Sequence, residues 1–322
     1  MGDKSKIAWT DATWNPVTGC SKVSEGCRNC YAERDFPRLT RLVPSYSGRS
    51  FEDVVCHSDR LEQPLRWKRP RKIFLNSMSD LFHPDVPEEF LRSVFTTMAL
   101  ASHHSFQILT KRPERMMEVL TGWNADGLVL KSGYGICLPN VWLGVSVEDQ
   151  KSAEERIPIL LETPAFFRWV SVEPMIGPVN LSDLSTDFEF PEEYRTDTDD
   201  SPSIALDALS GERWERFGHW SDRGNSLDWI VVGGESGPDA RPMEAEWLRG
   251  IIRECRKATV PLFVKQLGAT FSDPKNGIAG ASLKVSEAGI GLLGRRLKNR
   301  SGADTSEWAD DLKIREWPGC LV

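Results

Sequence analysis

Short apolar runs alternate with amphipathic segments along the chain from residue 72 onward. The amphipathic segments, which place apolar residues at helical spacing, are 86–101, 113–120, 150–162 and 243–258. We expect Pro158 to shorten or kink the third of them, because proline removes a helix hydrogen bond. The apolar runs have the near-continuous character of strands covered on both faces: KIFLNSMSD (72–80), FQILTKR (106–112), VWLGVSVED (141–149), AFFRWVSVEP (165–174), LDWIVVGGES (227–236) and PLFVKQLG (261–268).

This repeat of strand and helix predicts an α/β protein with about six parallel strands. A further strand near the N-terminus is expected around KIAWT (6–10) or VVCH (54–57). We therefore predict a full or partial (β/α) barrel over residues 1–270 and a C-terminal extension over 271–322. A doubly wound open sheet is the alternative, since both folds share this periodicity.

Residues 181–226 interrupt the repeat and are acidic, with few long apolar runs. We expect a solvated, mobile insertion; a lid over the C-terminal mouth of the strands is the alternative, because barrel chemistry lies there. The tail beyond residue 270 carries basic side chains that suit an ordinary solvated surface or a face for phosphate contacts: Lys284, Arg295, Arg296, Lys298 and Arg300.

The composition is that of a soluble globular protein, with 322 residues of which 40% are hydrophobic. No apolar run approaches the roughly 18 residues of a membrane span, and the start MGDKSKIAWTD lacks a signal-peptide core, so we expect a cytoplasmic protein. The net charge of −7 argues against a general electrostatic grip on nucleic acid. A local basic run, RWKRPRK at 66–72, could contact phosphates and stack a base on Trp67, or simply be a solvated approach to a strand.

Three of the seven cysteines, Cys20, Cys27 and Cys30, lie in the single stretch GCSKVSEGCRNCYAER at 19–34. An iron–sulfur cluster held by three cysteines keeps one iron open for a ligand, whereas a structural zinc needs four closed ligands. Cys56 or His57 would have to supply the fourth zinc ligand. The other cysteines are scattered, as buried small hydrophobes are: Cys56, Cys137, Cys255 and Cys320.

Polar residues stand at the carboxyl ends of the expected strands, and a barrel would bring them to one pocket. Several are charged, although burying a charge is costly unless it is paired. Gly233 and Gly234 would additionally let backbone amides approach a ligand. The predicted polar ring consists of Asn76, Ser77, Ser79, Asp80, Thr110, Lys111, Ser146, Glu148, Ser171, Glu173, Glu235, Ser236, Lys265 and Gln266.

Longer motifs carry a resemblance to a known family. They are WNPVTGCSKVSEGCRNCYAER, IFLNSMSDLFH, ILTKRPERM, WLGVSVE, RWVSVEPMIGP, DWIVVGGESGP with the ARPM that follows, and FVKQLG. Together they resemble a phage-associated family regarded as radical S-adenosylmethionine (SAM)-like, over most of the chain except the acidic insertion. The cluster loop departs from the usual superfamily spacing: three residues then two separate the cysteines there, and six then two separate them here.

The resemblance implies one [4Fe–4S] cluster on Cys20, Cys27 and Cys30, with SAM on the open iron and a 5′-deoxyadenosyl radical as the reactive species. A flavodoxin or ferredoxin would supply the electron. By position, Asn76, Ser77 and Asp80 would hold the methionyl part of SAM. Glu148, Glu173 and Glu235 would bind the ribose, the adenine or the substrate.

The same resemblance implies a nucleic-acid or nucleotide substrate and, for a phage-encoded protein, the host cytoplasm. The leading hypothesis is hypermodification of DNA thymine, such as rearrangement of an amino-acid-substituted thymidine. Lesion repair on DNA and modification of RNA are alternatives within the enzyme class. A zinc-stabilised nucleic-acid-binding protein without catalysis is the alternative from another class.

Overall fold

The core of the protein is a sheet of parallel strands, seen here in a computed structural model that describes residues 5–125, 137–186, 204–215, 221–278, 297–299 and 301–319. Seven strands pair in the order β1-β4-β5-β6-β7-β12-β14, and every pair is parallel. Their bounds are β1 Ala12–Trp14, β4 Lys72–Leu75, β5 Ser105–Thr110, β6 Val141–Val147, β7 Phe167–Val172, β12 Trp229–Gly233 and β14 Leu262–Gln266.

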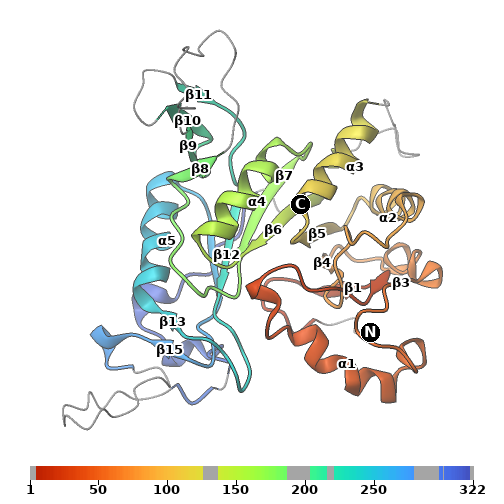
Figure 1. Ribbon diagram of the computed structural model, residues 1–322, viewed down its shortest axis with the longest axis horizontal. Helices are drawn as coiled ribbons and strands as arrows, with labels where there is room; N and C mark the ends of the chain where they lie inside the picture. The colour runs from red at the N-terminus through yellow and green to blue at the C-terminus, as the bar shows by residue number, and fades with distance from the viewer. Residues whose placement is uncertain are drawn as a thin grey trace.

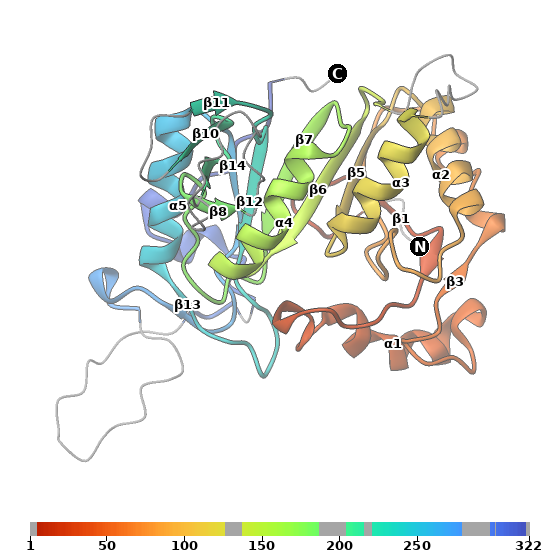
Figure 2. The same ribbon diagram turned by 45° about the horizontal axis from the view of Figure 1, so that its top comes forward.

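The strand order is the chain order, without the reversal that defines a doubly wound sheet. Right-handed crossovers in a single direction place the connecting helices on one face, and Figures 1 and 2 show α2 to α5 on the outside of the curved sheet. In the described part of the chain β1 and β14 do not pair, so the barrel is partial. The covering helices are α2 Glu88–Leu100, α3 Pro113–Ala125, α4 Gln150–Glu162 and α5 Ala245–Ala258.

The first strand lies between the two segments proposed for it. β1 has only three residues, too few for an alternation of polar and apolar positions to be visible in the sequence. The VVCH segment instead contributes β3 (Val55–Cys56), which pairs antiparallel with β2 (Val17–Thr18). Pro158 does not end α4, which continues to Glu162 after a capping box at its start between Asp149 and Ser152.

Inward-facing side chains explain why the barrel is open at one end. On β6 and β7 the facing pairs along the interior are Trp142 with Phe167, then Gly144 with Trp169, then two serines at 146 and 171. The side chains therefore shrink and become polar toward the carboxyl ends of the strands. The inner aromatic cluster, in which only Val231 is not aromatic, consists of Trp9, Phe74, Trp142, Phe167, Trp169, Trp229, Val231 and Phe263. The expected core positions of Trp142, Trp169 and Trp229 are therefore confirmed.

Gly144 makes room for the Trp169 indole, which gives a stability prediction. A Cβ at residue 144 would lie 2.5 Å from Trp169 Nε1, deep in a packed interior. We expect Gly144→Ala to lower the free energy of unfolding by about 1–3 kcal/mol through overpacking. Chemical denaturation measures it, with Gly122→Ala as the matched control: nothing lies within 4 Å of a Cβ there, so that helix substitution raises stability by about 0.5–1 kcal/mol. Equal effects of the two substitutions would contradict the packing argument.

The described part of the acidic insertion is folded, contrary to the expectation of a mobile loop. Its strands are antiparallel and bury Ile204 and Leu206. Hydrogen bonds tie it to the outer helices, from Ser185 N to Glu154 on α4 and from Leu181 N to Glu254 on α5. In Figure 1 this small sheet lies beyond α4 and α5, away from α1, so the described part is no lid; residues 187–203 and 216–220 are outside the described chain. The strands are β8 Leu184–Thr186, β9 Ile204–Asp207, β10 Glu212–Glu215 and β11 Ser221–Arg223.

The C-terminal extension covers the edge of the sheet. Val264 N donates to Ile314 O and Glu316 N to Leu262 O, so β14 has no open edge there. Two short strands, β13 (Met243–Glu244) and β15 (Phe271–Ser272), pair beside it. No helix of the described residues is long and apolar enough to cross a membrane. Of the basic tail residues, Lys298 is exposed, while Lys284, Arg295, Arg296 and Arg300 lie outside the described residues.

Candidate functional site

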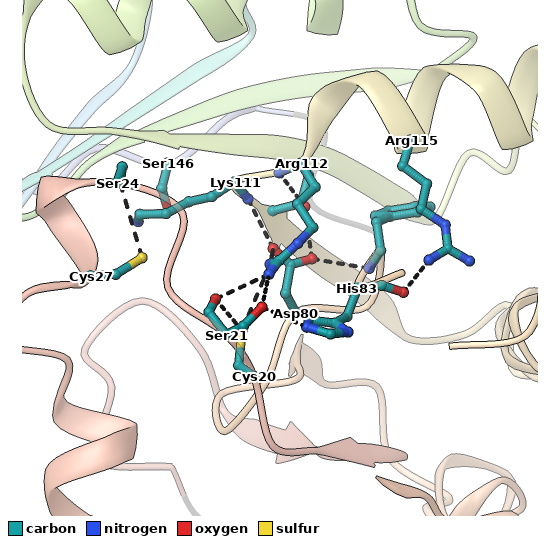
Figure 3. A network of polar contacts seen from close by, with 12 residues as sticks. Cys20, Ser21, Ser24, Cys27, Asp80, His83, Lys111, Arg112, Arg115 and Ser146 are labelled. Atoms are coloured by element: carbon teal, nitrogen blue, oxygen red, sulfur yellow. Dashed lines mark hydrogen bonds and ion pairs between the residues drawn. The ribbon is translucent and has the colours of Figure 1, made fainter. Parts of the chain in front are cut away.

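The three clustered cysteines lie at the carboxyl ends of the strands, where the interior is open. Cys20, Cys27 and Cys30 are free, partly buried thiols that line one cavity of about 150 Å³. The loop that carries them runs from β2 to α1 (Tyr31–Leu42), which begins directly after Cys30. Figure 3 shows Cys20 and Cys27 facing the ends of the neighbouring strands. The three cysteines therefore share a cavity with polar residues from the carboxyl ends of the strands.

Arg112 fixes the first cysteine. Its Nη1 lies 3.7 Å from Cys20 Sγ and 3.1 Å from Asp80 Oδ2, and its Nη2 donates to the Ser21 carbonyl at 3.0 Å. Burial, with a further contribution from Asp80, raises the pKa of the Cys20 thiol to about 11, and the Arg112 cation acts against both. A positive charge beside Cys20 is what a thiolate ligand requires.

Glu148 fixes the middle of the loop, inside the long gap between the first two cysteines. Gly26, which lies in that gap, donates its N–H to Glu148 Oε1 at 3.3 Å. A Cβ at Gly26 would come within 2.9 Å of the same carboxylate. Arg156 Nη1 donates to Glu148 Oε2 at 2.9 Å, and burial of this carboxyl, which alone would raise its pKa, is outweighed by Lys111 and Arg156, so the pKa is lowered.

Glu235 fixes the end of the loop next to the third cysteine. Asn29 Nδ2 donates to Glu235 Oε2 at 3.0 Å, and Arg241 Nη2 donates to Oε1 at 2.7 Å. The backbone N–H of Arg241 adds a bond of 2.8 Å. Burial acts to raise the pKa of Glu235, but these hydrogen bonds outweigh it and the pKa is lowered. The loop is thus held at its beginning, middle and end by what we call the three anchor pairs: Asp80–Arg112, Glu148–Arg156 and Glu235–Arg241.

Three residues that were predicted to bind the cofactor, Asp80, Glu148 and Glu235, are members of the anchor pairs. Asp80 has partners on both oxygens: Thr110 Oγ1 and Phe82 N on Oδ1, Lys111 N and Arg112 on Oδ2. Its carboxylate, like those of Glu148 and Glu235, is committed to protein contacts that position the loop. Sequence reasoning missed the three arginines; only Arg156, two helical turns beyond Glu148, lies at a spacing that hints at a pair.

Asn76 and Ser77 line the cysteine cavity as the sequence predicted. Asn76 is 4% exposed with a φ of +53°, and its Nδ2 is buried with no hydrogen-bond partner in the described chain. Such an unsatisfied donor is costly in an empty interior and marks a place for an acceptor from a ligand. Ser77 accepts a hydrogen bond on its carbonyl from Tyr31 OH at 2.6 Å.

Glu173 makes no side-chain hydrogen bond to the cysteine loop among the described residues. It pairs with Lys265 Nζ at 2.6 Å in a second, larger cavity of about 410 Å³. The two cavities adjoin, because they share wall residues: Cys27, Cys30, Tyr31, Phe74, Leu109, Lys111 and Ser146. The site therefore has a chamber beside Cys20 and a second chamber toward β7, β12 and β14.

The glycine pair has a packing role, and its expected contact with a ligand stays a prediction. A Cβ at Gly233 would lie 3.1 Å from the Glu173 carboxylate, and one at Gly234 would lie 2.3 Å from the Leu267 carbonyl oxygen. Gly233 thus gives space to Glu173, and Gly234 lets two backbone segments pass closely. Gly234 also lines the larger cavity, so the pair forms part of the site's wall.

The basic run at 66–72 is not a base-stacking site. Trp67 is buried, and Arg71 lies over its ring at 4.8 Å. The run also leads into the amino end of β4, opposite the cysteines. Arg71 covers the Trp67 ring, and Trp67 lines neither of the two cavities described above, so it offers no face to a nucleobase there.

The remaining cysteines differ in how far they are buried. Cys255 is buried as expected, Cys56 is partly buried and Cys137 is exposed, so the expectation of burial is wrong for Cys137. Cys320 lies outside the described residues.

The zinc alternative needed a fourth ligand from Cys56 or His57. The ring of His57 is hydrogen-bonded to Thr18 Oγ1 at 2.8 Å. Within the described ranges no three His, Cys, Asp or Glu side chains are arranged to hold a single metal ion, so the four-ligand zinc site has no support there.

The chain is similar to one protein family and to two solved structures. A family model described as "Protein of unknown function (DUF5131)" matches residues 4–307. No curated protein matches the chain. Two solved structures of spore photoproduct lyase mutants are similar to it, each with a TM-score of 0.41, at 13% and 14% sequence identity. The matches cover 81% and 84% of this chain and 78% and 79% of the other chains.

Proposed function

The chain belongs to the DUF5131 family, and we propose that it is a radical SAM enzyme that holds a [4Fe–4S] cluster on Cys20, Cys27 and Cys30. One observation carries the proposal: three free thiols from one loop line a single cavity at the open end of a partial (β/α) barrel. Open ends of such barrels are where their chemistry lies. Three thiols leave one iron of a four-iron cluster without a protein ligand, which is the position that SAM would take.

The residues present fit such a cluster. The thiols do not converge on a single metal ion, whereas a multi-iron cluster takes each thiolate on a different iron. Arg112 beside Cys20 offsets negative charge, and the unsatisfied Asn76 Nδ2 points to a missing acceptor in the same cavity. Both features suit an anionic cluster that carries a polar cofactor.

When bound, the cluster and SAM supply one-electron cleavage of a sulfonium bond and hence a species that abstracts hydrogen. The chain's own residues have positioning tasks. The three anchor pairs hold the cysteine loop, Asn76 and Ser77 offer polar groups to the methionyl part of SAM, and the aromatic cluster below closes the barrel to water. A reduced flavodoxin or ferredoxin would supply the electron in the cytoplasm, where thiols stay reduced.

For the substrate we propose a nucleobase, with rearrangement of an amino-acid-substituted thymidine in phage DNA as the specific reaction. The family resemblance of the long motifs supports this choice. Nucleoside mass spectrometry on DNA and RNA from cells with and without the gene identifies the base. A modified nucleoside confined to RNA would replace the DNA assignment.

The test of the chemistry is anaerobic reconstitution with iron and sulfide. We expect about four iron and four sulfide per chain, broad visible absorption, and release of 5′-deoxyadenosine when SAM and a reductant are added. A colourless protein that holds one zinc after this treatment would overturn the proposal.

A further inference from the structure

The pair Glu173–Lys265 differs from the three anchor pairs in its surroundings. The Lys265 ammonium and the Glu173 carboxylate are 2.6 Å apart, and their side chains are 21% and 19% exposed, facing the larger cavity. The anchor carboxylates Glu148 and Glu235 are only 2% and 5% exposed. Neither member of the Glu173–Lys265 pair contacts the cysteine loop in the hydrogen bonds of the described chain. Structural support of the loop therefore does not explain this pair.

Each member keeps hydrogen-bonding capacity for a ligand. Lys265 Nζ has three donors and uses one on Glu173 Oε1; the second carboxylate oxygen of Glu173 has no side-chain partner among the described residues. A ligand at this place meets an acceptor and a donor side by side. Adjacent opposite charges disfavour a purely anionic group, such as a phosphate, because Glu173 repels it, and a purely cationic group, because Lys265 repels it.

The floor of the same cavity is aromatic. Trp9 and Phe74 line it, with ring centroids 4.8 Å apart. Trp9 is 2% exposed, and its indole Nε1 is buried with no hydrogen-bond partner in the described chain, a donor that native interiors rarely leave unsatisfied. A volume of about 410 Å³ lies in the range of small-molecule sites. Aromatic floor and polar wall together suit a planar ring with a polar edge.

We propose that Glu173 and Lys265 bind the substrate as a planar heterocycle that carries an N–H donor beside a carbonyl acceptor, as a nucleobase does. Glu173 accepts from the ring N–H, Lys265 donates to the neighbouring carbonyl oxygen, and the ring lies beside Trp9 and Phe74, which line the same cavity. The inference rests on the proposed function, because it assigns the substrate of that enzyme to the larger cavity. Cys27 and Cys30 form the wall between this cavity and the cysteine cavity, so the substrate lies next to the proposed cluster.

Calorimetric titration of the anaerobically purified protein tests this inference with uridine and 3-methyluridine as probes. The two probes differ only in the ring N–H. We expect 3-methyluridine to bind the wild type about tenfold more weakly, equivalent to about 1.4 kcal/mol. In Glu173→Ala uridine weakens to the level of 3-methyluridine, and the two probes bind alike. Lys265→Met weakens both probes but keeps their ratio.

Lys275→Ala is the matched control, because Lys275 also pairs with a glutamate but lies exposed on the surface; it leaves both affinities unchanged. Thermal melting checks that Glu173→Ala is folded, and Lys265→Met provides an independent variant if it is not. Absence of uridine binding, or a methyl penalty that persists in Glu173→Ala, overturns the inference, as does binding of a free amino acid in place of the nucleosides. Cluster content and SAM cleavage are measured without nucleoside, so failure here is distinguishable from failure of the proposed function.

Discussion

Replacing Cys20, Cys27 or Cys30 by alanine, one at a time, removes the cluster and abolishes release of 5′-deoxyadenosine. Each substitution leaves two thiolates for four irons, fewer than the three that hold an open cluster. Loss of residues that merely support metal ligands already costs 10–100-fold, so we expect the loss of a ligand to reduce activity by at least about 100-fold. Iron and sulfide per chain after anaerobic reconstitution, together with chromatographic measurement of 5′-deoxyadenosine, give the two readouts.

Cys255→Ala is the control for this experiment. Cys255 is 1% exposed on the buried face of α5 and does not line the cysteine cavity, so it is not in position to act as a ligand there. Its loss costs some stability through a small cavity but leaves iron content unchanged. Cys56→Ala separates the zinc alternative, which needs a ligand from Cys56 or His57. Iron retained by Cys27→Ala, or metal lost from Cys56→Ala, would contradict the assignment.

The sequence reveals most of the barrel because each parallel strand is a continuous apolar run followed by an amphipathic helix. Strands β4, β6, β7, β12 and β14 fall within the expected runs, and β5 begins one residue before its run, at Ser105. β1 could not be predicted in this way, because three residues between a turn and a loop are too few to show a periodicity. The folded part of the insertion was not predicted either, because its buried apolar residues Ile204 and Leu206 stand in a short strand within a segment of acidic composition.

The site is only partly visible in the sequence. The cysteines and the carboxylates after each strand follow from strand order, which brings carboxyl ends together. The partners of those carboxylates depend on how far an arginine side chain reaches in the folded state. Arg112 comes from the connection between β5 and α3, Arg156 from the helix after Glu148, and Arg241 from the turn after Glu235. Sequence reasoning consequently assigned to the cofactor several carboxylates that hold the cysteine loop.

The second large effect is expected from removing the Glu148 carboxylate, which anchors the cysteine loop. Glu148 and Arg156 are 2% and 7% exposed, so Glu148→Ala leaves a buried, unpaired guanidinium and an unbonded Gly26 N–H. We expect the free energy of unfolding to fall by about 3–5 kcal/mol. We also expect the loop around Cys27 to loosen, which accelerates alkylation of Cys27 in the iron-free protein and lowers the iron retained through gel filtration after reconstitution.

Two further variants separate loop anchoring from general stability. Asp273→Ala breaks another buried pair, that with Arg249, whose side chains are 0% and 11% exposed. Asp273 comes from the C-terminal extension rather than the cysteine loop, so its loss lowers stability without changing alkylation of Cys27. The double variant Glu148→Leu with Arg156→Leu replaces the buried charges by apolar groups and should recover most of the stability, but it offers Gly26 no acceptor and leaves the loop loose. Alkylation that follows stability across all three variants, with Asp273→Ala as fast as Glu148→Ala, would show that Glu148 supports the fold alone.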